Sequence, residues 1–437
     1  MTLIELSPRA RTAPRLDVLP VAIIGAGPIG LAAAANFVER GIDFVVYEAG
    51  EKAAASMSSW RHIRLFSPWQ HLVDPAAARL LLAAGWRRPD DGVAPYASEL
   101  IDLYLEPLAA LEPIASKIEL DTTVVSVTRE GMDRTRSTGR DETPFQLRVV
   151  GADGEVRDIP ARAVIDASGT YLHPNSLSSN GLDPLGMADV ADRVTHALPD
   201  VLGAERDRFV GRHTVVVGAG HSAANTLINL AKLARETEGT RVTWVIRNSG
   251  AARVSNSEDD ELPGRASLGD RVERLVRTGA IELVTNFGIS RLVRTDVGVD
   301  LVGTAGDERR VHADRVVNAT GFRPNLEMLR EIRLDLDEIV EAPRRLAPLI
   351  DPNVHSCGTV EPHGFFELQQ PESGFFIAGM KSYGRAPTFL LATGYEQVRS
   401  IAAWLGGDMA AASTVQLVLP STGVCSTGDS AAGSCCS

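Results

Sequence analysis

Cysteine is scarce in this chain and unevenly distributed. The 437 residues include only four cysteines: Cys357, and then Cys425, Cys435 and Cys436 near the C-terminal end. Residues 1 to 356 therefore have no disulfide framework, which favours a reducing cytoplasm as the setting. They also have no close cysteine pair, so dithiol–disulfide chemistry inside either half of the chain is excluded.

A basic excess and long apolar runs are also lacking. The net charge of −12 and the pI near 5.3 argue against nucleic acid or an anionic membrane surface as a partner. The first twenty residues lack the apolar block of a secretory signal, and the stretch from Val21 to Ala35 is too short to span a bilayer. We therefore expect a cytoplasmic protein with no membrane partner. The length favours two or three domains.

An internal repeat organises the sequence. The segment "VAIIGAGPIGLAAAANFVERGIDFVVYEAG" at 21 to 50 is echoed by "HTVVVGAGHSAANTLINLAKLARETEGTRVTWVIRN" at 213 to 248. Each is a β-branched run, a glycine turn, an Ala/Leu-rich helical segment and a second apolar run, which predicts β-α-β. A β-meander pattern and a buried strand ending in Ala-Ser-Gly or Ala-Thr-Gly follow each block. Residues 373 to 405 predict one more strand, a Gly-rich loop and a helix, which we assign to the first sheet.

These elements predict an α/β fold with two Rossmann-like, three-layer nucleotide-binding domains, the second inserted in the first and each with a β-meander. The expected first domain comprises residues 1–210 and 320–409, and the inserted domain comprises residues 211–319. A flexible, cysteine-containing tail is expected at 410–437. The charged segment 128–143 is interpreted as a solvated hairpin loop.

The first glycine turn matches the G-x-G-x-x-G pattern as Gly25, Gly27 and Gly30, with Pro28 at the start of the helix. In this pattern the first glycine permits the turn, the second lets a pyrophosphate approach the backbone, and the third lets the helix pack on the strand. Glu48 ends the next strand, where its carboxylate can accept hydrogen bonds from both ribose hydroxyls. Because the adenine ribose of FAD has a free 2′-hydroxyl, we assign FAD to this loop.

The second glycine turn differs in the charge at its acceptor position. Its predicted cofactor-binding residues are Gly218, Gly220, His221, Ser222 and Ala223. The alanine replaces the third glycine, as the pattern permits. Arg247 follows the next strand, and its guanidinium can pair with a 2′-phosphate, although an exposed arginine without a ligand is the alternative. We therefore assign NADPH to this loop.

Together these residues resemble the flavoproteins with two dinucleotide-binding domains, a group that includes flavin-containing monooxygenases and thioredoxin-reductase-like enzymes. The motif "NATGFRP" resembles the Ala-Thr-Gly linker of that group and implies cofactor contacts at Thr320 and Gly321. Trp60 and Arg61 stand where monooxygenases place a tryptophan by the flavin. Gly379, in the Gly-rich loop after the last predicted strand, is added to the expected cofactor-binding set.

A narrower resemblance is to the ArsO-type flavoproteins of bacterial arsenic-resistance operons, carried by "RLFSPWQHLVDP", "VVVGAGHSAAN", "HSCGTVEPHG" and "GMKSYGRAPTFLLATGYEQVRS". It implies an FAD-dependent, NADPH-consuming monooxygenase acting on a small molecule, with an arsenical as the candidate substrate. The chain departs from the monooxygenase pattern at Val190 and Asp192, where that pattern has Phe and Gly, and "RLFSPW" lacks an Asn found in many relatives. A reductase or oxidase, and a metalloid-binding flavoprotein without turnover, therefore stay as alternatives.

No protein nucleophile is expected, because flavin and nicotinamide carry out the redox steps. His62 and His71 flank the expected flavin face. Cys357 has His355 and His363 nearby, but their spacing matches no closed metal site, and a buried structural thiol is favoured.

Soft thiolates bind soft ions, and trivalent arsenic takes three sulfurs, so Cys425, Cys435 and Cys436 are candidates for metalloid capture. An unstructured terminus with incidental thiols is the alternative. The expected partner is a small-molecule substrate, and a homodimer is left open.

Overall fold

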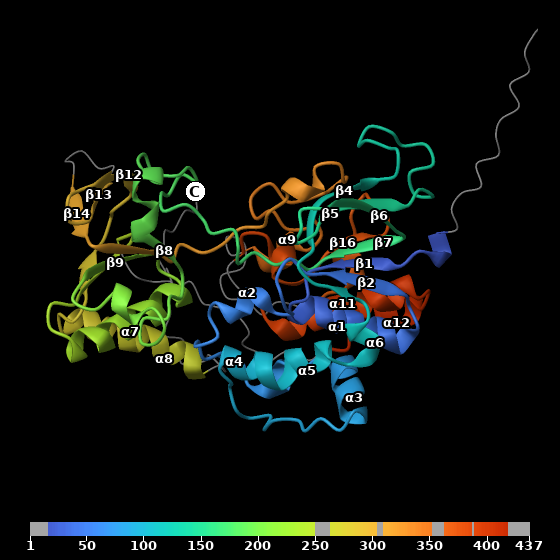
Figure 1. Cartoon of the computed structure of the whole chain (residues 1–437), viewed down its shortest axis with the longest axis horizontal. Coiled ribbons are helices and arrows are strands. Elements are labelled where there is room, and N and C mark those ends of the chain that lie inside the picture. Colours follow the sequence, from blue (N-terminus) through green and yellow to red (C-terminus); the bar gives the residue numbers. More distant parts are fainter. Residues whose placement is uncertain (1–15, 250–262, 304–308, 352–361, 387–388, 418–437) are drawn as a thin grey trace, which may run out of the picture.

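The computed structural model describes residues 16–249, 263–303, 309–351, 362–386 and 389–417. They form two units that lie side by side, one around β1 and the other around β9 (Figure 1). Each unit has a five-stranded parallel sheet and a three-stranded antiparallel meander, so the predicted α/β fold is confirmed.

The first sheet has the strand order β16-β7-β1-β2-β3. Its strands are β1 (Val21–Ile24), β2 (Phe44–Tyr47), β3 (Ile118–Glu119), β7 (Ala163–Asp166) and β16 (Phe375–Ile377). Every residue of β1 and β7 is buried, as expected for strands covered on both faces. Because β16 pairs with β7, the chain returns to this sheet after the second unit, as the sequence predicts.

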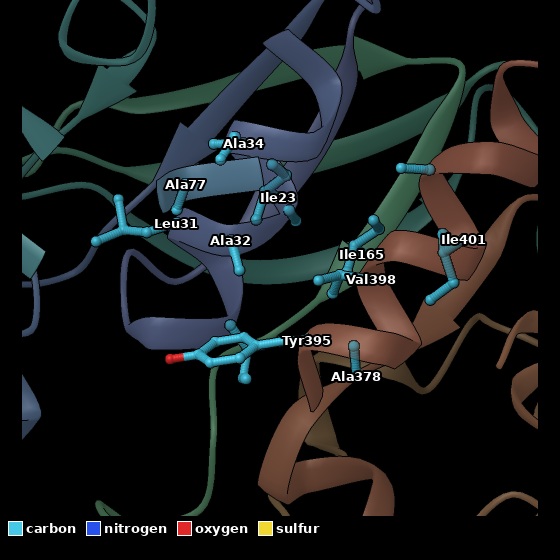
Figure 2. Packing of buried hydrophobic residues seen from close by; sticks show 14 of the residues in the cluster. Ile23, Leu31, Ala32, Ala34, Ala77, Ile165, Ala378, Tyr395, Val398 and Ile401 are labelled. Atoms are coloured by element: carbon cyan, nitrogen blue, oxygen red, sulfur yellow. The ribbon is translucent and has the colours of Figure 1, made fainter. Parts of the chain in front are cut away.

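Helices α1 (Pro28–Arg40) and α11 (Leu391–Leu405) pack together on this sheet. Proline at the first position suits the start of α1, and Gly41 ends it in the left-handed conformation, with φ 64°. Alanines of α1 leave room for Tyr395, Val398 and Ile401 of α11 against β1 and β7 (Figure 2).

The other helical segments of the first unit are short. They are α2 (Ala55–Ser58), α3 (Pro75–Ala83), α4 (Ala97–Leu100), a π-helical turn (Ile101–Leu105), α5 (Glu106–Ala109), α6 (Glu112–Ala115), α9 (Ala347–Ile350), α10 (Phe365–Leu368), α12 (Met409–Ser413), and 3₁₀ turns at Leu16–Val18, Trp69–His71, Glu327–Leu329 and Gly379–Tyr383. None of the helices in the described ranges is long and apolar enough to cross a membrane.

The second sheet has the order β11-β10-β9-β15-β8. Its elements are β8 (Val194–His196), β9 (His213–Val217), α7 (His221–Glu236), β10 (Arg241–Val245), α8 (Pro263–Arg277), β11 (Glu282–Val284) and β15 (Arg315–Asn318), with 3₁₀ turns at Ala188–Arg193 and Arg206–Arg208. The edge strand β8 comes from upstream of residue 211, and Leu177 and Val190 pack in the same unit. The segment before that expected boundary therefore contributes to the second core.

The two meanders lie on their respective sheets. They consist of β4 (Thr123–Arg129), β5 (Phe145–Val150) and β6 (Val156–Ala161) in the first unit, and of β12 (Ile289–Arg294), β13 (Val299–Gly303) and β14 (Arg310–Ala313) in the second.

Two arginines of the charged segment 128–143 are buried rather than solvated. Arg129 Nε lies 2.8 Å and Arg140 Nη2 lies 2.9 Å from the carboxylate of Glu372, which is itself buried. The prediction of a solvated loop was wrong for these two residues, because their acidic partner is distant in the sequence and no local pattern reveals it. The neighbouring Arg136 is exposed, as predicted.

A buried carboxyl group stands at the start of α3. Asp74 is 1% exposed, and its Oδ1 accepts a hydrogen bond from Ala77 N at 2.8 Å. The side chain of Asn36 and the hydroxyl of Tyr104 lie beside it. Burial raises the pKa of Asp74 to about 6, against the opposing effect of its hydrogen bonds. The folded protein therefore holds a proton here at pH values where the unfolded chain has released it.

The substitution Asp74→Asn should stabilise the protein at neutral pH. Because the pKa of Asp74 is about 6 in the folded protein and ordinarily 3.8, ionisation of Asp74 lowers stability as pH rises from about 4 to about 6. Asparagine keeps the helix cap and has no charge to bury, so we expect a gain of about 2 kcal/mol at pH 8 and little gain at pH 4. Thermal unfolding at both pH values measures this. Asp408→Asn, at the exposed cap of α12, is the matched control; a gain at Asp74 that does not depend on pH would contradict the prediction.

Candidate functional site

The first glycine loop has the geometry of a phosphate cradle. Gly25 follows β1 with φ 98°, and a Cβ there would lie 2.9 Å from the carbonyl oxygen of Ala167. A Cβ on Gly30 would lie 1.9 Å from the carbonyl oxygen of Gly25, so helix and turn are in direct backbone contact. A Cβ on Gly27 would have no protein atom within 4 Å. The protein thus fills the space at the first and third positions and leaves the second open to a ligand, while Pro28 begins α1.

The carboxylate of Glu48 lies against this loop. It follows β2 and is 9% exposed; Oε2 accepts a hydrogen bond from Ala26 N at 2.7 Å, and Oε1 accepts one from Gly50 N at 2.9 Å. These bonds fix the carboxylate beside the cradle, in the position where a ribose would meet it.

Three buried polar atoms beside the cradle have no hydrogen-bond partner among the described residues. They are Ser58 Oγ, Trp60 Nε1 and His62 Nε2. Their segment is attached to the loop, because Ala54 N donates to Ala26 O at 3.0 Å. Buried donors and acceptors without partners are costly, and a polar ligand would remove that cost. Together with the open position at Gly27, these atoms fit a dinucleotide with a polar ring system.

Aromatic side chains continue from this segment toward the second unit. The ring of Trp60 lies 6.2 Å from that of Tyr171, which lies 5.2 Å from that of Phe322. The neighbouring Arg61, predicted to contact the cofactor, pairs with Asp102 at 2.9 Å in an exposed position, and its cofactor contact stays a prediction.

The second glycine loop repeats the arrangement of the first. Gly218 has φ 128°, and a Cβ there would lie 2.1 Å from the carbonyl oxygen of Ala319, whereas a Cβ on Gly220 would have no protein atom within 4 Å. The substituted third position, Ala223, is fully buried in the helix contact. His221 begins α7. The amino-terminal amides of this 16-residue helix face the open position and suit an anion.

The other predicted residues of this loop lie around it. Ser222 is the second residue of α7 and is half-buried. The ring of His221 lies 5.3 Å from that of Phe66, which comes from the first unit. Arg247 is exposed, two residues beyond the end of β10. Because Gly25 N donates to Tyr47 O and Gly218 N donates to Val245 O, Arg247 lies one residue beyond the position that corresponds to Glu48.

The predicted linker residues join the two units. Asn175 N donates to Gly321 O at 2.9 Å. Thr320 Oγ1 lies 2.7 Å from Asn318 Oδ1 and 3.2 Å from Asn175 O, either of which can accept its one proton. The Thr320 hydroxyl is therefore used to hold the two crossing segments together. Gly321 has φ 99°, which favours glycine at this turn.

Gly379 lies in the first unit, against α1. Its φ is 71°, a Cβ would lie 2.9 Å from Ile29 Cγ1, and its N–H donates to Gln397 Oε1 at 2.8 Å. Two residues later, the ammonium of Lys381 pairs with Asp166 at 2.6 Å and donates to Ser168 Oγ at 3.1 Å. Sequence reasoning missed this fully buried pair, because a lysine in a Gly-rich loop is ordinarily exposed.

Cys357, its neighbour His355, and Cys425, Cys435 and Cys436 lie outside the described residues. In the described part of the chain, no group of three His, Cys, Asp or Glu side chains is arranged to bind a metal ion.

The predicted histidines near the site are described. Burial lowers the pKa of His71, His62 has the unpartnered Nε2 noted above, and His363 is buried with its Nε2 2.9 Å from Gln397 Nε2. The contacts of these three histidines do not assign any of them a role as a catalytic acid or base.

Residues 19–371 match the pyridine nucleotide-disulphide oxidoreductase family. The chain belongs to this family. A search of curated proteins found no match. Among solved structures, the chain is similar to the bacillithiol disulfide reductase of Bacillus cereus, with a TM-score of 0.65 and 21% identity over 89% of this chain and 99% of that one.

Two monooxygenases have the same fold. The cadaverine monooxygenase of desferrioxamine biosynthesis from Erwinia amylovora has a TM-score of 0.63 and 15% identity, covering 92% of this chain and 98% of that one. The flavin-containing monooxygenase of Stenotrophomonas maltophilia has a TM-score of 0.56 and 22% identity, covering 89% and 98%. The family identifies the chain as a flavoprotein oxidoreductase, and at these identities the neighbours show the shared fold. The link to arsenic-resistance flavoproteins stays a prediction.

The second and third glycines of the first loop predict different effects for the same substitution. Gly27→Ala should leave folding intact, because its Cβ meets no protein atom, but should weaken FAD binding about tenfold or more by filling the open position. Gly30→Ala should lower the thermal midpoint, because its Cβ would clash with the backbone of Gly25. FAD titration by flavin fluorescence and thermal unfolding separate the two effects, with Gly92→Ala in an exposed loop as the control. Equal FAD affinity in wild type and Gly27→Ala would refute this reading of the cradle.

Proposed function

We propose that the protein is an FAD-dependent, NADPH-consuming monooxygenase that acts on a small molecule. The observation that carries the proposal is the pair of open glycine cradles, at Gly27 and Gly220, on two units of a pyridine nucleotide oxidoreductase. Bound FAD and NADPH would supply hydride transfer and the reduction of oxygen.

The chain's own residues would orient these cofactors. Glu48, held by two backbone N–H groups, would accept hydrogen bonds from the ribose of FAD, and the amides at the start of α7 would bind the pyrophosphate of NADPH. Trp60 and Tyr171 would exclude water from the region between the two cradles.

The choice of NADPH over NADH rests on Arg247. Arg247 is exposed beyond β10, one residue after the position where the first unit has the carboxylate of Glu48. A cation there would pair with the 2′-phosphate that only NADPH carries, whereas a carboxylate would repel it.

The substitution Arg247→Ala should reduce the preference for NADPH. We expect kcat/KM for NADPH to fall about tenfold or more while the value for NADH changes little, because only NADPH loses a charge-assisted hydrogen bond. Steady-state kinetics with both nucleotides measure this. Arg241→Ala, at the opposite end of β10, is the matched control. An equal loss with NADPH and NADH would show that Arg247 does not read the 2′-phosphate.

The absence of cysteine from residues 1–356 argues against the disulfide chemistry for which the family is named. Residues 1–356 have no cysteine, so neither glycine cradle nor the linkers between them can contribute an internal redox pair. Oxygen, rather than a protein disulfide, is therefore the electron acceptor that we propose. An NADPH oxidase without oxygen transfer is the second candidate, favoured by Val190 and Asp192 in place of the Phe and Gly of the monooxygenase pattern.

A trivalent arsenical is the substrate that we propose, on the resemblance to arsenic-resistance flavoproteins and on the soft-ion preference of the tail thiols. In the balanced reaction, substrate, O₂, NADPH and a proton give the pentavalent product with one oxygen atom from O₂, together with NADP⁺ and water. The thiols of Cys425, Cys435 and Cys436 would concentrate the substrate.

The purified protein should oxidise NADPH faster when methylarsenite is added, and product formed under ¹⁸O₂ should contain one labelled oxygen per NADPH consumed. Hydrogen peroxide equal to the NADPH consumed, without labelled product, would identify an oxidase. If the arsenical does not increase NADPH consumption, the remaining function is metalloid binding without turnover.

Replacing all three tail cysteines with serine should raise KM for the arsenical and leave NADPH oxidation without substrate unchanged. An unchanged KM would remove the tail from the proposal.

A further inference from the structure

Arginines gather at the edge of the second sheet opposite its glycine loop. Arg315 is the first residue of β15, and the parallel pairing of Val316 with Val194 places Arg193 beside it, just before β8. Arg212 immediately precedes β9, the strand on the other side of β15. Three neighbouring strands therefore begin next to an arginine at one edge of the sheet.

A fourth arginine, Arg208, and three acidic residues, Asp192, Glu205 and Asp314, also lie at this edge. Asp314 directly precedes Arg315, and its Oδ2 accepts a hydrogen bond from His213 N at 2.7 Å. Arg208 Nη2 donates to Thr195 Oγ1 on β8 at 2.9 Å, and its Nη1 lies 2.5 Å from Glu205. Arg193 Nε lies 3.4 Å from a carboxylate oxygen of Asp192, which also pairs with Arg294. Within the described ranges, neither Arg315 nor Arg212 has a carboxylate at ion-pair distance.

Two N–H groups in the cluster are buried without an acceptor. The Nε atoms of Arg193 and Arg315 have no hydrogen-bond partner among the described residues. The long contact of Arg193 with Asp192 lacks hydrogen-bond geometry, and Arg315 donates only from Nη1, to the carbonyl oxygen of Asp192 at 2.8 Å. Burial, and then the like charges of Arg193, Arg208 and Arg212, lower the pKa of Arg315. The cluster thus carries both unneutralised charge and unused donors.

We propose that this arginine cluster (Arg193, Arg208, Arg212 and Arg315) binds a phosphate-type oxyanion, either free or as the terminal group of a small metabolite. A tetrahedral dianion supplies several acceptor oxygens at once, and the planar fork of a guanidinium matches two of them. Because the chain has a net charge of −12, anion binding here would depend on the positive charge that these arginines concentrate locally.

The site is separate from the proposed nucleotide site. Arg315 and the Gly218 loop lie at opposite ends of β15 and β9, which pair in parallel from Arg315 to Asn318. That length of strand corresponds to about 10 Å. Anion binding at the cluster would therefore not depend on the identity of the nucleotide or of the substrate.

Isothermal titration with inorganic phosphate tests the proposal. The protein is saturated with FAD and NADP⁺, so that the glycine cradles are occupied, and ionic strength is held constant with chloride. We expect one phosphate per chain, and an affinity at least about tenfold lower in Arg315→Met. Arg212→Met serves as the second variant, because Arg212 is exposed and its loss should not affect folding. Arg87→Met, exposed on the first unit, is the control and should bind phosphate like wild type.

Titration with glucose 6-phosphate distinguishes the two sources of the anion. Binding as tight as that of inorganic phosphate supports a phosphorylated metabolite, and binding of inorganic phosphate alone supports the free ion. Two results would overturn the proposal. One is no phosphate binding to the wild type at concentrations on the order of 10 mM, where even a weak site would be occupied. The other is equal affinity in wild type, Arg315→Met and Arg212→Met. Failure of FAD or NADP⁺ to bind would instead count against the proposed function, and the comparison of arginine variants would still decide the anion site.

Discussion

Close backbone contact at the carboxyl edge of each sheet is the constraint on which both units depend. The first glycine of each loop presses against the segment that leaves the neighbouring strand: Gly25 against Ala167, and Gly218 against Ala319. Any side chain at these glycines would collide with a main-chain carbonyl, and both have positive φ. The repeated Ala-Ser-Gly and Ala-Thr-Gly sequences are therefore the places where a linker passes over a glycine turn. This contact explains why the two motifs recur together in each half of the chain.

The same linkers connect the two units. The residues that shape the glycine cradles therefore also join the units to each other. Pro174 pairs with Phe322 as an isolated bridge, and Arg323 N donates to His173 O at 3.0 Å. At the other end of the first linker, the buried Lys381–Asp166 pair attaches the end of β7 to the segment that follows β16. Breaking such a pair would leave one charge buried without a partner, which is costly. The first unit is thus closed by a chain segment that arrives only after the second unit is complete.

Local sequence patterns predicted what local forces determine. Alternation and helical periodicity indicated the β-α-β blocks and meanders, and the glycine spacing predicted which positions would stay open at Gly27 and Gly220. Contacts between distant residues were not predictable in this way. Glu372 pairs with both Arg129 and Arg140, and it follows the inserted unit, so nothing near the arginines signals their burial. The unpartnered polar atoms of Ser58, Trp60 and His62 likewise became visible only when burial and geometry were known.

Strand β15 ties the two ends of the second unit together. It begins at Arg315 in the arginine cluster and ends at Asn318, whose side chain donates to Asn175 O at 2.8 Å in the other linker. The strand is paired on both sides, with β8 and β9, and such a strand transmits strain rather than absorbing it. On the anion-binding proposal, an ion at one edge and a nucleotide at the other would contact the ends of the same short strand. They would not compete for space, because the parallel sheet directs its amino and carboxyl ends to opposite edges. The arrangement allows one unit to carry two sites for anions while the first unit provides the carboxylate-lined cradle.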